Sequence, residues 1–298
     1  MVSILRLLIY KMPNQFRSMG ALLQMKTVHW LLIALAIPCV LGGWVLYRYR
    51  VENDTRVSTV DSPSSASAFS HNRFNKVLQT YVDAKGWVNY KALKKNPKDL
   101  EAYLDQLAAT APEDLPRREQ LAFWINAYNA LIIKGVIDHY PTKSVRKVKP
   151  FGGFFSRIKF QVGGESYTLN DIEHDIIRTE FSEPRIHFAL VCASVGCPIL
   201  RNRAFMPDTL DEQLDDATFN FINNSDKVRL DRSKRVLYLS KIFEWYGEDF
   251  EDTHDGIVDF ILDYLPETDV TFIEQNDPTI RYLDYDWTLN DPALKKQK

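Results

Sequence analysis

Cysteine and histidine side chains gather in one short stretch of the chain. Residues 184–198 read PRIHFALVCASVGCP and contain His187, Cys192 and Cys197. A cysteine becomes a nucleophile when a nearby histidine or a helix N-terminus lowers the pKa of its thiol. Cys197 precedes Pro198, and because proline is tolerated in the first turn of a helix, Cys197 fits a helix start. The stretch is therefore a candidate site for thiol-dependent hydrolysis or acyl transfer, with Cys197 as the nucleophile.

Polar residues on other apolar segments are candidate partners of that thiol. His187 and His174 are the candidate general bases, and Asn126 is a candidate orienting group. Asn129 and Glu173 are candidate pocket residues, because polar side chains on apolar segments are costly to bury without a hydrogen-bond network. Asn126 and Asn129 lie one helical turn apart, so a second interpretation is that they hold a neighbouring loop by bonding its backbone.

The two cysteines also admit a non-catalytic interpretation. In an oxidising compartment Cys192 and Cys197 form a disulfide, and the domain is then a periplasmic binding or scaffold module. A metal site made of His174, His187 and both cysteines is a third interpretation, but the CxxxxC spacing is looser than that of a zinc knuckle, so no metal is predicted. The sequence contains no phosphate-binding loop, GxGxxG or HExxH motif, and no cofactor is predicted.

A second unusual patch is the aromatic and acidic run KIFEWYGEDF, residues 241–250. Trp245 and Tyr246 are candidate pocket residues, and together with Glu248 and Asp249 they could surround a polar or cationic group. The alternative is a helix end that buries its aromatic side chains and leaves its acids in water, as such residues usually do.

The elements that must position these residues combine helices with antiparallel hairpins. The segment 117–139 is apolar around most of a helical circumference from Leu121 to Ile137, which predicts a buried central helix. Helical spacing and caps predict further helices, several of them amphipathic, near 74–82, 97–107, 169–178, 208–223 and 254–265. Alternation predicts hairpins over 158–167 and 227–239, and 279–289 reads as extended. The predicted fold class is α+β.

The charge of the chain is divided unevenly along its length. The 298 residues are 45% hydrophobic and 26% charged with a net charge of −2, which describes a folded protein and argues against a nucleic-acid partner bound by bulk electrostatics. Residues 1–50, however, contain six basic residues and no acidic one. Within them, 28–47 is an uncharged run as long as a membrane-spanning helix, with Trp30, Trp44 and Tyr47 near its ends.

This pattern predicts a domain order and a location. We expect a basic segment over 1–27, an anchor or uncleaved signal over 28–47, a flexible linker over 48–70, one domain over 71–290 and a polar tail over 291–298. A cleaved secretory signal is the rival interpretation, although no small-x-small site directly follows the run. The natural start is Met1 or Met25. The prediction is a single-pass protein of a bacterial inner membrane, bound through 28–47, with its domain in the periplasm.

Several segments resemble the uncharacterised family called domain of unknown function 547. The matching segments, in that family's order, are 123–133, 169–178, 184–198, 210–222, 239–250 and 283–290. The resemblance covers nearly all of 71–290 and implies no established activity. The motif residues that it carries over are Asn126, Asn129, Glu173, His174, His187, Cys192 and Cys197.

Overall fold

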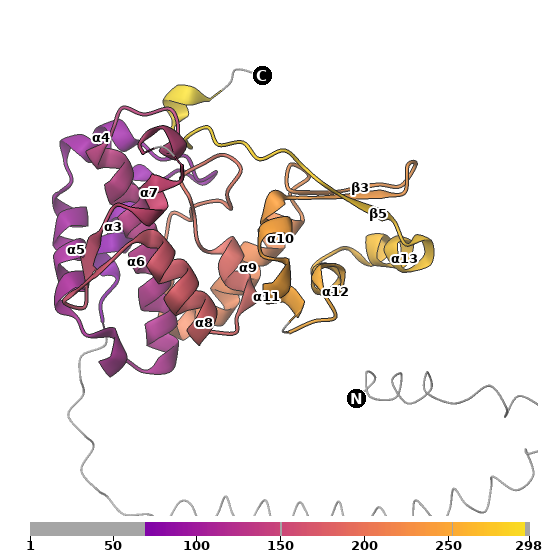
Figure 1. The fold of residues 1–298 in the computed structure, drawn as a ribbon, viewed down its shortest axis with the longest axis horizontal. Helices are drawn as coiled ribbons and strands as arrows, with labels where there is room; N and C mark the ends of the chain where they lie inside the picture. Colours follow the sequence, from indigo (N-terminus) through magenta and orange to yellow (C-terminus); the bar gives the residue numbers. More distant parts are fainter. Residues whose placement is uncertain (1–68, 150, 252, 296–298) are drawn as a thin grey trace, which may run out of the picture. The chain divides into compact units, whose positions relative to one another are not determined.

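The described part of the chain has an α+β fold. The computed structural model describes residues 69–149, 151–251 and 253–295 (Figure 1). The expected basic segment 1–27 and anchor 28–47 lie outside these residues, as does the linker 48–70 apart from its last two positions. Within the described ranges, no helix combines the length and the apolar character that crossing a membrane requires.

The predicted central helix is confirmed. Helix α6 (Arg117–Asp138) is buried continuously from Leu121 to Ile133. Around it lie α3 (Asn72–Tyr81), α4 (Tyr90–Lys95) and α5 (Lys98–Ala109), which together form the helical half of the domain (Figure 1). The absence of a side chain at Gly135 admits a neighbouring ring, because a Cβ there would lie 2.8 Å from Phe154. The continuous burial explains why this helix shows no polar face.

A series of short elements follows α6 and leads to the site. They are η3 (Val145–Lys147), α7 (Gly153–Ser156), the hairpin of β1 (Phe160–Val162) and β2 (Glu165–Tyr167), the π-helical η4 (Asp171–Ile177) and α8 (Arg178–Glu180). Thr168 begins η4, since its hydroxyl accepts from the N–H of Asp171 at 3.2 Å while Asp171 accepts from the N–H of Thr168 at 2.7 Å. This reciprocal cap satisfies donors that the helix itself cannot. The sequence offers both Thr168 and Asn170 as the cap of this helix, and in the structure Thr168 makes the capping hydrogen bonds.

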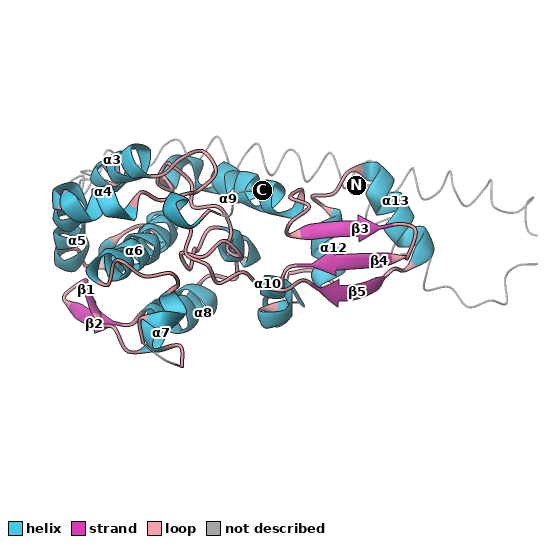
Figure 2. Cartoon of the chain, turned by 90° about the horizontal axis from the view of Figure 1, so that it is seen from above, coloured by secondary structure: helices cyan, strands magenta, loops and turns pink. Residues whose placement is uncertain are grey.

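The remaining elements follow, and most of them build a second half around a small sheet. They are η5 (Pro184–Phe188), η6 (Pro207–Thr209), α9 (Leu210–Ile222), β3 (Val228–Asp231), β4 (Val236–Leu239), α10 (Lys241–Trp245), α11 (Gly247–Glu251), α12 (Ile257–Leu262), α13 (Glu267–Asn276), β5 (Thr279–Tyr282) and η7 (Pro292–Leu294). The predicted hairpin 227–239 is β3 paired antiparallel with β4. β5 joins β4 on its other edge in parallel, with Val236 opposite Thr279 (Figure 2). A parallel partner needs a crossover, and α10 to α13 form it.

Each half has its own hydrophobic cluster. The first surrounds α6, and the second lies between α9, the sheet and α10 to α12. Phe188 belongs to the second, where its ring centroid lies 4.9 Å from Phe221, 5.7 Å from Phe243 and 5.9 Å from Phe260. Such aromatic pairs add to the free energy gained from burial. Phe188 therefore fixes the position of its neighbour His187.

Candidate functional site

Most of the residues proposed from the sequence line one pocket. The pocket has a volume of about 400 Å³ and lies where η4, α10 and the segment 187–198 meet. Seven predicted site residues line it: Glu173, His174, His187, Cys192, Cys197, Trp245 and Tyr246. The tertiary structure thus unites the two separate sequence patches, 184–198 and 241–250, in one site.

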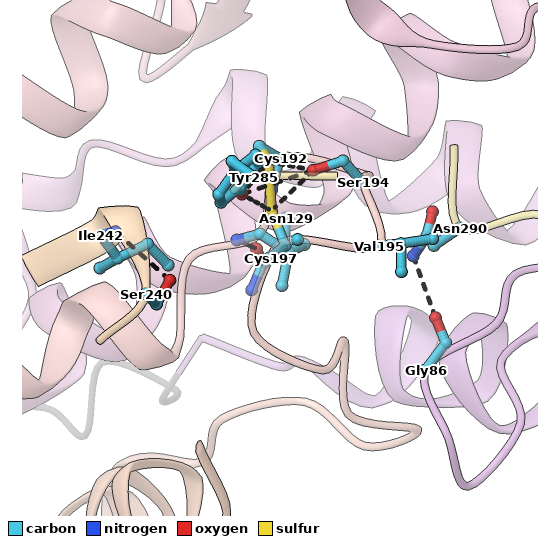
Figure 3. Close-up of a disulfide and its surroundings, with 12 residues drawn as sticks. Gly86, Asn129, Cys192, Ser194, Val195, Cys197, Ser240, Ile242, Tyr285 and Asn290 are labelled. Atoms are coloured by element: carbon cyan, nitrogen blue, oxygen red, sulfur yellow. Dashed lines mark hydrogen bonds between the residues drawn. A yellow bond between two sulfur atoms is a disulfide. The ribbon is translucent and has the colours of Figure 1, made fainter. Parts of the chain in front are cut away.

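A disulfide joins Cys192 and Cys197 on the wall of this pocket (Figure 3). The phenolic oxygen of Tyr285 lies 3.1 Å from the sulfur of Cys192 and 3.2 Å from that of Cys197. Ser194 also contacts both sulfurs. Among the described residues, neither sulfur has a histidine as a hydrogen-bond partner. In this state the site contains no free thiol that His174 or His187 could deprotonate.

The loop that carries the disulfide is held from both sides. The ammonium of Lys227 donates to the carbonyl oxygens of Val195, at 2.8 Å, and Gly196, at 2.7 Å. Burial lowers the pKa of Lys227 to about 8. A Cβ at Gly196 would lie 2.8 Å from the ring of Tyr285. Glycine is required at this position, because only its bare backbone lets that ring approach the sulfurs.

His187 belongs to a hydrogen-bond network at one end of the pocket that also contains the Arg178–Asp249 ion pair. Its Nε2 lies 2.6 Å from Asp249, and the guanidinium of Arg178 donates to the same carboxylate at 2.7 Å. Burial alone would raise the pKa of Asp249, but the hydrogen bonds from Arg178 and His187 outweigh it and hold this pKa well below its usual range. An ionised carboxylate only accepts hydrogen bonds, so the proton between the two lies on Nε2 of His187. Asp249 therefore fixes the tautomer and orientation of the ring.

Glu173 is clamped by two tyrosines. Its two carboxylate oxygens accept from Tyr128 and Tyr246, each at 2.6 Å, and the residue is only 8% exposed. Burial, together with the nearby charge of Glu173, raises the pKa of both phenols, so their hydroxyls stay protonated and donate. The ring of Tyr246 also stacks on His187 at 4.1 Å between centroids. With histidine taken as neutral, Glu173 is the one formally charged side chain among the described residues lining the pocket.

An aromatic cluster forms part of the pocket wall. The ring centroid of Trp245 lies 4.8 Å from Tyr285 and 5.9 Å from Trp287, and those two lie 4.7 Å apart. Phe151 and Phe155 line the pocket as well. Trp245 is 44% exposed, which is unusual for so large an apolar side chain. The wall therefore offers aromatic surface to a ligand.

Asn126 and Asn129 do not line the pocket but hold the loops that form it. The amide of Asn126 bonds the backbone of Phe205 twice, donating to its carbonyl at 2.7 Å and accepting from its N–H at 2.9 Å. Asn129 likewise donates to the carbonyl of Ala189 and accepts from the N–H of Val191, both at 3.0 Å. This is the loop-holding interpretation of the pair. Asn126 uses both ends of its amide in these bonds and makes none to His174 or His187.

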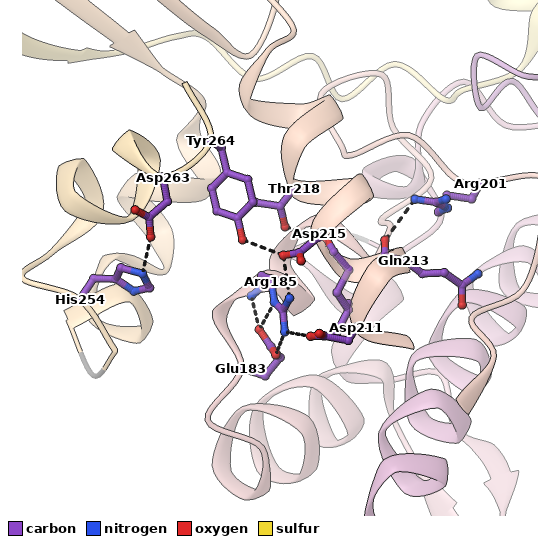
Figure 4. A network of polar contacts seen from close by, with 11 residues as sticks. Glu183, Arg185, Arg201, Asp211, Gln213, Asp215, Thr218, His254, Asp263 and Tyr264 are labelled. Carbon is purple, nitrogen blue, oxygen red and sulfur yellow. Dashed lines mark hydrogen bonds and ion pairs between the residues drawn. The ribbon is translucent and has the colours of Figure 1, made fainter. Parts of the chain in front are cut away.

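A second network fixes the turn η5, which contains His187. Arg185 contacts three carboxylates: Glu183 at 2.6 Å, and Asp211 and Asp215 of α9 at 2.7 Å (Figure 4). Tyr264 donates to Asp215 at 3.1 Å. Because one guanidinium bonds several carboxylates at once, the conformational entropy of the Arg185 side chain is lost only once for all of these contacts. Arg185 thus ties η5 to α9 two positions before His187.

The pocket and network residues that escaped the sequence analysis include Tyr128, Arg178, Tyr285 and Trp287. Tyr285 and Trp287 alternate within a segment quoted for the family resemblance, so their spacing was an available signal. Tyr128 lies within the apolar run of α6, where an aromatic residue is expected to be part of the hydrophobic core. Arg178 had no local signal. Within the described part of the chain, no cluster of three or more histidine, cysteine or acidic side chains could hold a metal ion.

Comparison with known proteins gives a family resemblance and no activity. Residues 112–222 match the model of a family described as "Protein of unknown function, DUF547". This range contains α6, η4, the disulfide loop and α9, and it ends before the sheet and α10. No curated protein and no solved structure matches the chain. Over 112–222 the chain is similar to that uncharacterised family, in agreement with the resemblance drawn from the motifs.

Proposed function

We propose that the described domain is a binding module whose pocket takes a small molecule or peptide group that carries an alkylammonium cation. The observation that supports this most is the composition of the pocket. Seven of its eighteen described lining residues are Phe, Tyr or Trp, and Glu173 is the one side chain with a formal charge among them. A cation is attracted both to aromatic faces and to a buried carboxylate.

The pocket is organised in advance for such a ligand. Tyr128 and Tyr246 each occupy one lone pair of Glu173, and a carboxylate offers about four, so acceptor positions remain for a ligand. The two hydrogen bonds also fix the carboxylate before binding, which reduces the entropy lost when a ligand arrives. The disulfide and Tyr285 fix another part of the wall in the same way.

Titration with matched ligands tests this proposal. We expect a trimethylalkylammonium ion to quench or shift the tryptophan fluorescence of the full chain, and its neutral tert-butyl isostere to bind more weakly. Trp245→Ala and Glu173→Gln should each weaken ammonium binding by about 3- to 30-fold, the effect of losing about 0.5–2 kcal/mol of cation attraction. Trp87→Ala, which removes a tryptophan that does not line this pocket, is the matched control. Equal affinity for the two ligands would refute the proposal.

A thiol-dependent hydrolase or acyl transferase is the second candidate, with Cys197 as nucleophile and His187 or His174 as base. It is favoured by His187, which lines the same pocket as the sulfurs and is oriented by Asp249 as a general base would be. Its chemistry needs a free thiol, so a dithiol must first deliver two electrons and two protons to the disulfide and itself become oxidised. Alkylation of native protein with iodoacetamide decides between the two candidates. Modified Cys197 without prior reduction supports the enzyme, and complete protection supports the binding module.

We also propose that residues 28–47 anchor the chain in a bacterial inner membrane with the domain in the periplasm. The uncharged run and its terminal aromatic residues support the anchor. An oxidising compartment agrees with a disulfide between Cys192 and Cys197. Membranes washed with alkaline carbonate should retain the protein, and protease added to spheroplasts should digest the domain. Release by carbonate would contradict the anchor, and protection from protease would contradict the periplasmic location.

A further inference from the structure

A basic segment with an exposed phenylalanine lies beside the pocket. Between positions 143 and 159 the chain contains no acidic residue and six basic ones: Lys143, Arg146, Lys147, Lys149, Arg157 and Lys159. The side chain of Phe151 is 96% exposed, the highest value among the large apolar residues that the structure describes. We call Phe151 and these six residues the basic tip.

Packing brings the parts of the basic tip together. Lys143, Arg146 and Lys147 line one open hollow together with Trp287 and one acidic residue, Asp286. The guanidinium of Arg146 lies 5.2 Å from the ring centroid of Trp287. Two more basic residues lie beside Gly153, at the start of α7. A Cβ at this position would lie 2.9 Å from Lys149 and 3.1 Å from Arg157. Within each of these two groups the basic residues are therefore neighbours in space as well as in sequence.

Most of these charges lack an acidic partner, in contrast to several arginines elsewhere in the domain. Among the described residues, no carboxylate lies within ion-pair distance of Lys143, Arg146, Lys147, Lys149 or Lys159, whereas Arg178, Arg185, Arg201 and Arg232 all have one. Clustered basic residues create a positive potential that a negatively charged surface would neutralise.

The backbone presents Phe151 outward instead of burying it. Phe151 has a φ of 55° and Gly152 one of 73°, both in the left-handed region. That conformation is uncommon for phenylalanine and is retained only where the surroundings require it. The neighbouring Phe154 is completely buried and Phe155 partly so, which fixes α7 to the domain behind the exposed ring. A phenylalanine held in water among lysines combines the two features that bind a protein to a lipid interface.

We propose that the basic tip docks on an anionic lipid bilayer, with Phe151 entering the interface and the basic residues contacting lipid phosphates. This goes beyond the proposed ligand pocket and does not depend on its occupant. Each basic residue near an anionic surface strengthens attachment about fivefold, so the set is strong enough to hold a loop that an anchor already keeps close. Because Phe151 also lines the pocket, docking would place that part of the pocket wall next to the membrane.

Hydrogen exchange on the full chain in vesicles tests this docking separately from any membrane anchor. The chain is reconstituted in phosphatidylcholine alone and in a mixture with phosphatidylglycerol, so that an anchor is present in both. We expect amides 151–157 to exchange at least about tenfold more slowly in the anionic vesicles, with the difference removed by high salt. Phe151→Ala and Lys143→Glu/Lys147→Glu should each abolish most of that protection.

Matched variants and a second polyanion complete the test. Phe219→Ala removes another exposed phenylalanine, and Lys98→Glu/Arg118→Glu reverses two basic residues at the starts of α5 and α6, where acids are tolerated. Both controls should keep the protection. Equal protection in neutral vesicles, or protection that survives Lys143→Glu/Lys147→Glu, would overturn the proposal. So would equal protection by a duplex oligonucleotide added to the chain in neutral vesicles, since the tip would then be a nucleic-acid surface.

Discussion

Replacing Asn129 with alanine tests whether this residue acts by holding the loop before the disulfide. The change removes the only hydrogen bonds that the structure shows for the Ala189 carbonyl and the Val191 N–H, both 3.0 Å from the Asn129 amide. Asn129 is buried, so both groups lose a partner away from bulk solvent. Each unsatisfied buried group costs about 1–3 kcal/mol, and a water entering the space offsets part of this cost. We expect the free energy of unfolding to fall by about 2–4 kcal/mol.

Urea unfolding of the full chain in a nonionic detergent, followed by tryptophan fluorescence, measures this loss. With a slope of about 2 kcal/mol per molar urea, the midpoint should fall by about 1–2 M. Asn220→Ala is the matched control, because Asn220 is exposed on α9 and bonds only Asp216 of its own helix; its effect should stay within about 0.5 kcal/mol. If Asn129→Ala shifts the midpoint no more than the control does, the loop-holding role is refuted.

Three further predictions concern pH and redox state. The pKa of Asp249 is lower in the folded protein than in the unfolded chain, where it is near 4, so its ionised carboxylate stabilises the fold above about pH 4 and this contribution is lost as the pH falls through the folded pKa. Asp249→Asn should therefore reduce the fall of the unfolding free energy at acidic pH. Parallel curves of unfolding free energy against pH for the two proteins would contradict this. Burial lowers the pKa of Lys227 from 10.5 to about 8, so the unfolded chain binds more protons between these values and stability should rise with pH there. Lys227→Met should remove that rise, measured as the difference between the two pH profiles. Replacing Cys192 and Cys197 together with serine should cost about 2 kcal/mol in urea unfolding, the loop-closure value for so short a loop, and an unchanged midpoint would show that the bridge does not form in solution.

The sequence predicts the local parts of the fold well. The apolar run of α6, the cap at Thr168 and both hairpins depend on residues close together in the chain, and the structure contains all of them. The sequence is less informative where a segment's conformation depends on a partner that is distant in the chain. The apolar run 186–192 alone does not distinguish a buried strand from a buried helix, and the structure instead forms the end of the 3₁₀ turn η5 followed by residues outside any helix or strand. The expected extended run 279–289 is a strand only over β5, because only there does β4 offer a free edge.

The candidate site shows the same division. Residue types and family motifs identified seven of its lining residues, because polar side chains on apolar segments are conspicuous. They did not separate the residues that line the pocket from those that hold its loops. Asn126 and Asn129 share a helix with Tyr128, but Tyr128 reaches the pocket while both amides bond loop backbone. Helical spacing assigns a residue to a face of the helix and cannot say which neighbour covers that face.

By itself, the sequence determined which residues could do chemistry, how charge is divided along the chain and where the longer helices other than α13 (Glu267–Asn276) lie. These properties depend on side-chain type and on short-range spacing. Only the tertiary structure decided that Glu173 bonds Tyr128 and Tyr246, 45 and 73 positions away, and that His187 pairs with Asp249 across 62 positions. Contacts over such separations form when packed elements bring their side chains together, and no local periodicity encodes them. That packing surrounded the pocket with aromatic rings and one buried carboxylate.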